Sequence, residues 1–242
     1  MDSKKNILVT GGTRGIGLEI SKKLSKKNTV ITVTGTTKKR PENINDDFLY
    51  EQLDLSSDKS VNDLISKISK SNKYYDVLIN NAGINKISEL ANLNFKDFSN
   101  VINVNLINTA KLTIFIAKSM QENKLRMGRI VNIASIWSEI TKEGRVSYAT
   151  SKSGLIGMSR SLATDLAKNG ILVNSVSPGF IDTDLTRASL SKEEIDLMRQ
   201  QIPLKRLGKP SEIAELVCFL ASKKNTYITG QNIFIDGGFK NV

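Results

Sequence analysis

The chain has 242 residues, of which 39% are hydrophobic and 24% charged, which is the composition of a folded globular protein with room for one α/β domain. The chain has one cysteine, Cys218, and no histidine. This composition excludes a disulfide framework within the chain, metal sites built from cysteine or histidine, and hydrolase mechanisms of the Ser-His-Asp or Cys-His type. The net charge of +11 suits either an acidic partner or solvated helix faces. The lysines are spread out and form no nucleic-acid-binding motif, which favours solvated faces.

No apolar run approaches the roughly 18 residues of a membrane span. The run that follows Lys4 and Lys5 is too short for a signal peptide, and it leads directly into a glycine-rich turn. We therefore expect a cytoplasmic protein with no metal site and no membrane or nucleic-acid partner.

Seven apolar runs are typical of β-strands: Ile7–Thr10, Val30–Thr34, Phe48–Leu53, Val77–Asn80, Arg129–Ala134, Leu172–Ser177 and Asn232–Asp236. Between them, apolar residues at helical spacing predict helices over Ile16–Leu24, Val61–Ile68 and Leu155–Leu166, and Ser211 marks the start of a later one. Strands that alternate with helices imply right-handed βαβ units. The prediction is one α/β domain over residues 1–242, a doubly wound parallel sheet of about seven strands with helices on both faces.

The first predicted strand runs into the turn TGGTRGIG at residues 10–17, and a helix follows. Glycine permits positive φ and lets a ligand approach the main chain closely. The helix N-terminus offers N–H groups and the positive end of its dipole to a phosphate. In this context Gly11, Gly15 and Gly17 predict a dinucleotide site, and a tight turn alone is the structural alternative.

The second predicted strand ends near Gly35, where an NAD site usually has an acid that binds the ribose 2′-hydroxyl. The chain continues here with TTKKR at residues 36–40, and the first acid is Glu42. Hydroxyls and cations suit a 2′-phosphate, and Arg14 in the glycine turn can point to the same place. The pattern favours NADPH/NADP over NADH/NAD, whereas Lys38–Arg40 taken alone also fit a solvated loop.

Tyr148 and Lys152 lie four residues apart in YATSK, at the start of a predicted helix, so they share a face. A nearby ammonium lowers the pKa of a phenol, which lets the phenol give a proton to a carbonyl oxygen. Taken alone, such a pair is usually a surface pair. Ser135, however, follows a predicted strand at the edge where doubly wound sheets bind ligands, and NNAG at 80–83 ends another.

The segment 182–208 is the most irregular part of the chain, with a polar, helix-like stretch at Ser191–Gln201. Its length and its position after a sheet strand favour an active-site lid over an ordinary connection.

Together these motifs resemble the short-chain dehydrogenase/reductase family over about Lys5–Phe239. The resemblance rests on TGGTRGIG, LDLS at 53–56, NNAG, Asn105 in NVN, Ser135, YATSK, PGFIDT at 178–183 and the ending YITGQNIFIDGG. It implies a single NADP-binding Rossmann domain and an oxidoreductase acting on C=O and CH–OH groups. It also implies a homotetramer in which helices at about Phe98–Gln121 and Tyr148–Lys168 pair between subunits.

The roles of family residues carry over to the matching positions. Tyr148 is implied as the general acid/base, Lys152 as the group that lowers its pKa and holds the nicotinamide ribose, and Ser135 as the group that orients the carbonyl. Asn105 would support a proton-relay water. The implied cofactor-binding residues are Gly11, Thr13, Arg14, Gly15, Ile16, Gly17, Thr36, Thr37, Asp54, Leu55, Asn81, Ala82, Gly83, Tyr148, Lys152, Pro178, Gly179, Ile181 and Thr183.

Within the family, three stretches resemble 3-oxoacyl-(acyl-carrier-protein) reductases: PGFIDTDLT, PLKRLGKPSEIAELVCFLAS at 203–222 and YITGQNIFIDGG at 227–238. This implies an NADPH-dependent carbonyl reductase with a small-molecule or acyl-carrier-bound substrate. Asn85–Ser88 and Trp137 depart from that pattern beside the substrate, and Trp137 is either a substrate wall or packing. The alternatives are an enzyme of a sugar, polyol or other small alcohol, and a non-catalytic regulator, against which the complete catalytic set argues.

Overall fold

The seven predicted strands form one parallel sheet in the order β3-β2-β1-β4-β5-β6-β7, which confirms the doubly wound fold. The structure, a computed structural model, describes residues 4–71, 73–123, 127–189 and 191–241. The predicted strand ends differ from the observed ones by at most two residues, and β4 is observed as predicted. The strands are β1 (Lys5–Val9), β2 (Thr29–Gly35), β3 (Leu49–Gln52), β4 (Val77–Asn80), β5 (Arg129–Ile133), β6 (Leu172–Pro178) and β7 (Asn232–Ile235).

The central strand β1 pairs with both β2 and β4, so that Ile7 lies opposite Ile31 on one side and Val77 on the other. The chain winds outward from β1 to β3, returns to β4, and winds outward the other way to β7. The loops after β1 and β4 therefore leave in opposite directions, which opens a crevice at the carboxyl ends of these two strands.

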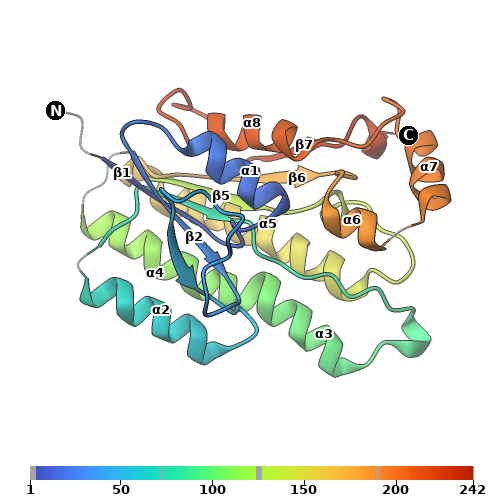
Figure 1. The fold of residues 1–242 in the computed structure, drawn as a ribbon, viewed down its shortest axis with the longest axis horizontal. Coiled ribbons are helices and arrows are strands. Elements are labelled where there is room, and N and C mark those ends of the chain that lie inside the picture. The colour runs from blue at the N-terminus through green and yellow to red at the C-terminus, as the bar shows by residue number, and fades with distance from the viewer. Residues whose placement is uncertain (1–3, 72, 124–126, 190, 242) are drawn as a thin grey trace.

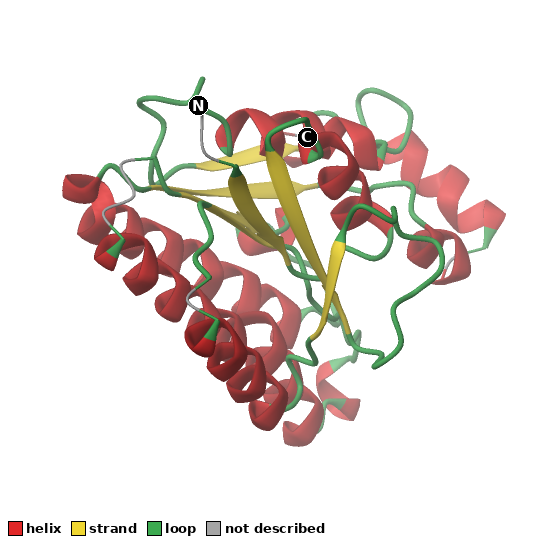
Figure 2. Cartoon of the chain, turned by 60° about the vertical axis from the view of Figure 1, so that its left-hand side comes forward, coloured by secondary structure: helices red, strands yellow, loops and turns green. Residues whose placement is uncertain are grey.

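Helices cover both faces of the sheet (Figures 1 and 2). On one face, α1 and α8 pack together and bury Ile20 and Val217 against the strands. On the other face, α2, α4 and α5 bury Leu64, Ile116 and Ala163. The helices are α1 (Gly15–Leu24), α2 (Asp58–Lys70), α3 (Phe95–Ile102), α4 (Asn108–Glu122), α5 (Val146–Leu166), α6 (Asp184–Ser189), α7 (Lys192–Gln201) and α8 (Pro210–Leu220).

Three predicted helices are confirmed as α1, α2 and α5, and two other expectations change in detail. The late helix begins at Pro210 rather than Ser211, because proline has a helical φ and lacks the N–H that a first turn leaves unbonded. The long helix expected over about Phe98–Gln121 is instead α3 and α4, joined by a π-helical turn over Asn103–Ile107.

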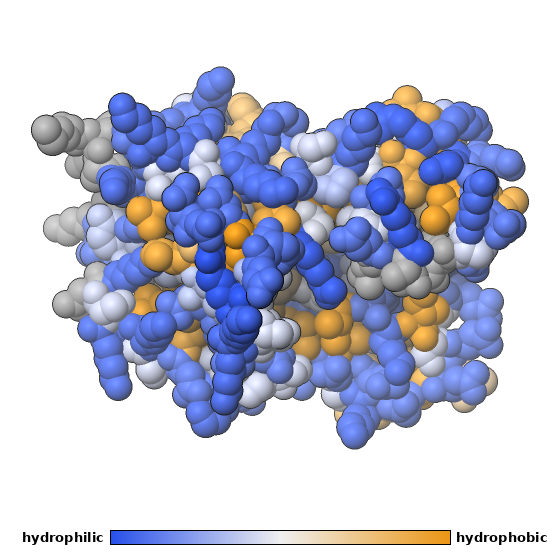
Figure 3. All heavy atoms as spheres, in the orientation of Figure 1, coloured by the Kyte–Doolittle hydropathy of each residue, from blue (hydrophilic) through white to orange (hydrophobic). Residues whose placement is uncertain are grey.

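Hydrophilic side chains cover most of the face seen in Figure 3. Several lysines form exposed ion pairs along their own helix, such as Lys22 with Glu19 and Lys59 with Asp63. None of the helices in the described ranges is long and apolar enough to cross a bilayer.

A chain of buried hydrogen bonds runs through the sheet and ties it to α5. Asn80 Nδ2 donates to Asn132 Oδ1 at 2.7 Å and to Thr113 Oγ1 at 2.7 Å. Asn132 Nδ2 donates to Ser159 Oγ on α5 at 2.7 Å, and Ser175 Oγ of β6 donates to the same hydroxyl at 2.7 Å. Three strands and two helices thus share one polar network, in which Asn80 Oδ1 is a buried atom without a partner.

Asn132→Ala is expected to lower the free energy of unfolding by about 2–4 kcal/mol, because it removes partners from Asn80 and Ser159, both buried. Urea unfolding followed by circular dichroism measures the change. The control is Asn123→Ala, which removes an exposed amide bonded to Ser119 and is expected to cost at most about 0.5 kcal/mol. Equal effects of the two variants would contradict a structural role for the network.

Candidate active site

Four strand ends bring the predicted site residues to one edge of the sheet. The glycine loop follows β1, Asn81–Gly83 follow β4, Ser135 follows β5, and Gly179–Thr183 follow β6. Helix α5 carries Tyr148 in its first turn and Lys152 one turn later. Residues from distant parts of the sequence meet here because all parallel strands end at the same edge.

The N-terminus of α1 fits a phosphate. Gly11 has a φ of +62° and Gly15 a φ of +53°, which are backbone conformations that favour glycine. The N-cap residue Arg14 is extended and its side chain caps no N–H group, and the first turn holds no acid. In α2, by contrast, the Ser57 side chain accepts a hydrogen bond from the first turn. The uncapped N–H groups of α1 are therefore available to a pyrophosphate.

Asn81 fixes the shape of the glycine loop. Its Nδ2 donates to the carbonyl oxygens of Thr10 at 3.1 Å and Gly11 at 3.0 Å. The N–H groups of Asn81 and Ala82 both donate to the Thr10 hydroxyl. A Cβ atom at Gly17 would lie 2.3 Å from the Gly11 carbonyl oxygen, so only glycine fits there. Thr10 is not among the predicted site residues, and its place between strand and glycines is the signal that could have marked it.

The end of β2 lies beside the glycine loop. A Cβ atom at Gly35 would be 3.1 Å from Thr13 Cγ2. The Thr37 carbonyl oxygen accepts a hydrogen bond from the Tyr50 hydroxyl at 2.5 Å, and the Thr36 carbonyl oxygen accepts one from a glutamine of β3. These contacts order the segment that is expected to meet the 2′-phosphate.

Some of the cations expected to bind the 2′-phosphate near the end of β2 already form ion pairs within the protein. Lys39 pairs with Glu42 at 3.4 Å, and Arg40 pairs with Asp46 at 3.1 Å, so both close a local turn. Arg14 is exposed in the adjoining glycine loop. Within the described ranges, the geometry therefore leaves Arg14 and the exposed Lys38, rather than Lys39 or Arg40, as the cations here without an ion-pair partner.

Ser135, Tyr148 and Lys152 lie together at the carboxyl end of β5. The Ser135 hydroxyl lies within the range at which hydrogen bonding lowers the pKa of the Tyr148 phenol. Lys152 Nζ lies 5.7 Å from the centre of the Tyr148 ring and donates to the Ile133 carbonyl oxygen at 2.8 Å. Lys152 is 4% exposed and Ser135 is 7% exposed, so the polar atoms of this cluster are largely shielded from water.

Burial shifts both ionisable groups of the cluster toward their neutral forms. It raises the pKa of Tyr148, while the Ser135 hydrogen bond and the nearby charge of Arg145 oppose that rise. It lowers the pKa of Lys152 from 10.5 to about 8. Burial therefore moves the two pKa values apart, with that of the phenol above its usual 10.0 and that of the ammonium near 8.

Asn105 joins this cluster from the π-helical turn. Its Nδ2 donates to the Ile84 carbonyl oxygen at 2.8 Å and to Ser151 Oγ at 3.0 Å, and its Oδ1 accepts the Ile84 N–H. Ser151 in turn donates to the Tyr148 carbonyl oxygen. A Cβ atom at Gly83 would lie 3.1 Å from Asn105 Oδ1 and 3.5 Å from Lys152 Nζ, so glycine is needed for this close approach. π-Helical turns like the one over Asn103–Ile107 are frequent at functional sites.

The remaining predicted cofactor contacts differ in whether their side chain or only their main chain is accessible to a ligand. The side chains of Leu55 and Ile181 are buried in the two core clusters, so only their main chains face a ligand. The Asp54 carboxylate accepts hydrogen bonds from Ser56, in the turn before α2. The other predicted contacts, Ile16, Pro178 and Gly179, lie on the same sheet edge. No cluster of three or more metal-binding side chains occurs within the described ranges.

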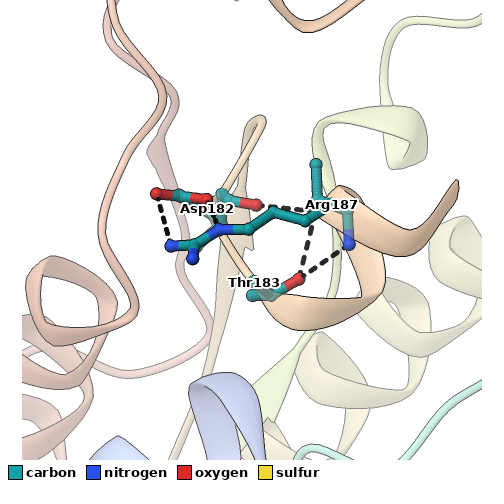
Figure 4. A network of polar contacts seen from close by, with 5 residues as sticks. Asp182, Thr183 and Arg187 are labelled. Carbon is teal, nitrogen blue, oxygen red and sulfur yellow. Dashed lines mark hydrogen bonds and ion pairs between the residues drawn. The ribbon is translucent and has the colours of Figure 1, made fainter. Parts of the chain in front are cut away.

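The predicted lid is anchored at both ends. Ile181 and Gly208 form a parallel bridge, and Asp182 N–H donates to the Gly208 carbonyl oxygen at 2.8 Å. Arg187 Nε donates to Asp182 Oδ1 at 2.7 Å, and a second guanidinium bond of 3.0 Å makes the pair bidentate (Figure 4). A Cβ atom at Gly15 would lie 3.7 Å from Thr183 Cγ2, so the lid begins directly over the glycine loop. The polar helix expected at Ser191–Gln201 is confirmed as α7.

Known proteins match the chain over almost its whole length. A family profile described as "Enoyl-(Acyl carrier protein) reductase" matches residues 11–240. The 3-oxoacyl-(acyl-carrier-protein) reductase FabG of Aquifex aeolicus is 39% identical over 96% of this chain and 95% of its own. A solved short chain dehydrogenase/reductase family protein superposes with a TM-score of 0.89 at 32% identity, covering 100% of both chains. A 4-hydroxyisoleucine dehydrogenase complexed with NADH gives 0.91 at 30% identity, covering 99% of this chain and 100% of its own.

Lys152→Met is expected to stabilise the fold at neutral pH by about 1–3 kcal/mol, because it removes a buried ammonium. With the folded pKa near 8 and the unfolded value at 10.5, the unfolded chain binds more protons between these limits, so wild-type stability rises with pH there. The variant lacks this rise. Urea unfolding across that pH range tests it, with the exposed Lys142→Met as control. A less stable Lys152→Met protein at neutral pH would contradict the expectation.

Proposed function

Since the chain belongs to the short-chain dehydrogenase/reductase family, we propose that it is an NADPH-dependent oxidoreductase that reduces 3-oxoacyl thioesters carried on acyl carrier protein. The observation that carries the proposal is the clustering of Ser135, Tyr148 and the buried Lys152 ammonium at the carboxyl end of β5. The name of the Aquifex relative supports the substrate class. The net charge of +11 suits an acidic carrier.

Side chains of the protein bind the carbonyl oxygen of the substrate and supply the proton that it receives. A bound nicotinamide cofactor supplies the hydride for the carbonyl carbon. The Ser135 hydroxyl donates a hydrogen bond to the carbonyl oxygen and holds it next to Tyr148. The Tyr148 hydroxyl gives its proton to that oxygen, and the Lys152 ammonium stabilises the phenolate that remains. Asn105 keeps Ser151, and through it the first turn of α5, in place.

This arrangement favours reduction of a carbonyl over reduction of a carbon–carbon double bond. Ser135 and Tyr148 place two hydroxyl donors near each other at the carboxyl end of β5. Negative charge develops on oxygen when a carbonyl carbon accepts hydride, and two donors to that oxygen stabilise it. The second candidate is an enzyme of a small hydroxy acid, sugar or polyol, which the likeness to a 4-hydroxyisoleucine dehydrogenase favours.

The same proposal includes a cytoplasmic homotetramer. Exposed apolar side chains on and beside the helices expected to pair support it, among them Phe95 (79% exposed), Ile107 (52%) and Ile114 (44%). Burial of these side chains against another subunit would remove them from water. The edge strand β7 offers a second self-complementary surface.

Tyr148→Phe is expected to lower kcat by about 10²–10⁴, because only the transferable proton is lost. NADPH oxidation is measured with an acetoacetyl thioester, a crotonyl thioester and a set of small ketones and keto sugars. The matched control is Tyr227→Phe, at a position 96% exposed, which is expected to keep wild-type activity. Turnover of the crotonyl thioester alone, or of the small ketones alone, would contradict the proposed substrate.

Arg14→Ala is expected to weaken NADPH binding by roughly ten- to a hundredfold, because a charge-assisted contact contributes on the order of 1.5–3 kcal/mol. NADH lacks the 2′-phosphate, so its dissociation constant is expected to stay nearly unchanged. Calorimetric titration of both cofactors measures this, with Lys22→Ala on the exposed face of α1 as control. An equal loss for both cofactors would assign Arg14 to the pyrophosphate or to the fold.

A further inference from the structure

Arg145 occupies a position that is unfavourable for a cation. It is 8% exposed, and it is the N-cap residue of the 21-residue helix α5, whose dipole is positive at that end. Its Nε atom has no hydrogen-bond partner, and none of the ion pairs formed within the described ranges includes it. A buried cation without a counterion costs several kcal/mol in proteins.

The surroundings of Arg145 compensate this cost only in part. Its guanidinium lies 5.1 Å from the centre of the Trp137 ring, a cation–π contact that is weaker than a buried ion pair. Trp137 itself packs edge-on against Phe180 and Phe239, so it is held as part of an aromatic wall. This wall begins two residues after Ser135 and therefore keeps the guanidinium close to the proposed active site.

Tyr148 is the ionisable group in the helical turn that follows this cation. It lies three residues after Arg145, on the same side of the helix. The two charges interact, because Arg145 lowers the pKa of Tyr148 and Tyr148 raises the pKa of Arg145, in each case against the effect of burial. An arginine that lacks a fixed counterion beside a phenol gains one whenever that phenol loses its proton.

The other charged groups on the packed segments have partners or lie farther out. Lys152 bonds to the Ile133 carbonyl oxygen, and Glu139, which follows the wall, pairs with Lys240. On the side of α3, Asp97 pairs with Lys86. Lys142 also lies over Trp137, at 5.9 Å, but it is exposed to solvent.

We infer that Arg145 is a positioning residue for the proton transfer, a second cation besides Lys152 that stabilises the phenolate form of Tyr148. The inference rests on the proposed role of Tyr148. During reduction the O–H bond of Tyr148 breaks and an O–H bond forms on the former carbonyl oxygen of the substrate. The phenolate that remains is then the counterion of Arg145 until a proton from solvent restores the phenol.

The test follows the ionisation of Tyr148 itself. Tyr148→fluorotyrosine lowers the intrinsic pKa of the phenol, and fluorine NMR then reports its titration without substrate. In this background Arg145→Gln is expected to raise the titration midpoint by about one pH unit or more, whereas Arg145→Lys keeps the charge and stays close to the unsubstituted protein. Lys142→Gln removes the other cation over Trp137 and is the matched control, with no expected shift.

The kinetic consequence is measured in the chain with its natural tyrosine. Arg145→Gln is expected to lower kcat by up to about tenfold with little change in KM, and Arg145→Lys to restore most of it. An unshifted titration in folded Arg145→Gln protein overturns the inference, and a KM rise confined to carboxylate-bearing substrates would assign Arg145 to substrate binding. Failure of the proposed function is separate, because it appears as wild-type protein that does not reduce the acetoacetyl thioester.

Discussion

The place of α5 against the sheet depends on hydrogen bonds made inside the core. Asn132 of β5 bonds to Ser159 of α5, and Asn80 of β4 bonds to Asn132. Amides in a core cannot slide by one residue without losing partners, so this network fixes both the strand register and the depth of the helix. Tyr148 and Lys152 lie nearer the start of the same helix, so the network that positions the helix also positions these two residues. A proton-transfer geometry needs such rigid support, because a displacement of a fraction of an ångström already weakens it.

The site buries two cationic side chains, Lys152 and Arg145, at positions where burial destabilises the folded state. In the part of the chain that the structure describes, Lys152 is buried with one hydrogen-bond partner, the Ile133 carbonyl oxygen, and Arg145 is buried against an indole ring. Both cations oppose the folded state, and both gain when a negative oxygen forms nearby. Burial alone raises the pKa of the Tyr148 phenol, so cations on either side of it are needed to make it a usable acid. The same low-dielectric surroundings that make the two charges costly also strengthen their effect on the phenol.

Features set by local sequence period were predictable, and features set by tertiary packing were not. The strands and the helices α1, α2 and α5 follow from apolar spacing, and the glycine loop follows from its place between a strand and a helix. The π-helical turn at Asn103–Ile107 leaves no mark on the apolar pattern that distinguishes it from an ordinary helix. Pairing of Lys39 with Glu42 depends on how a short loop folds back. Arg145 could have been noticed as a cation at a helix N-terminus, but its burial required the structure.

The glycine loop and the lid are parts of one assembly at the switch point of the sheet. Thr183 at the start of the lid lies over Gly15, and Thr10 at the start of the loop is bound by Asn81 from β4. The bridge between Ile181 and Gly208 holds the two ends of the lid side by side, so its ordering costs less chain entropy than that of a segment with distant ends. The Asp182–Arg187 pair is partly exposed and contributes little to holding the lid in one place. A ligand in the glycine loop would therefore lie against the start of the predicted lid.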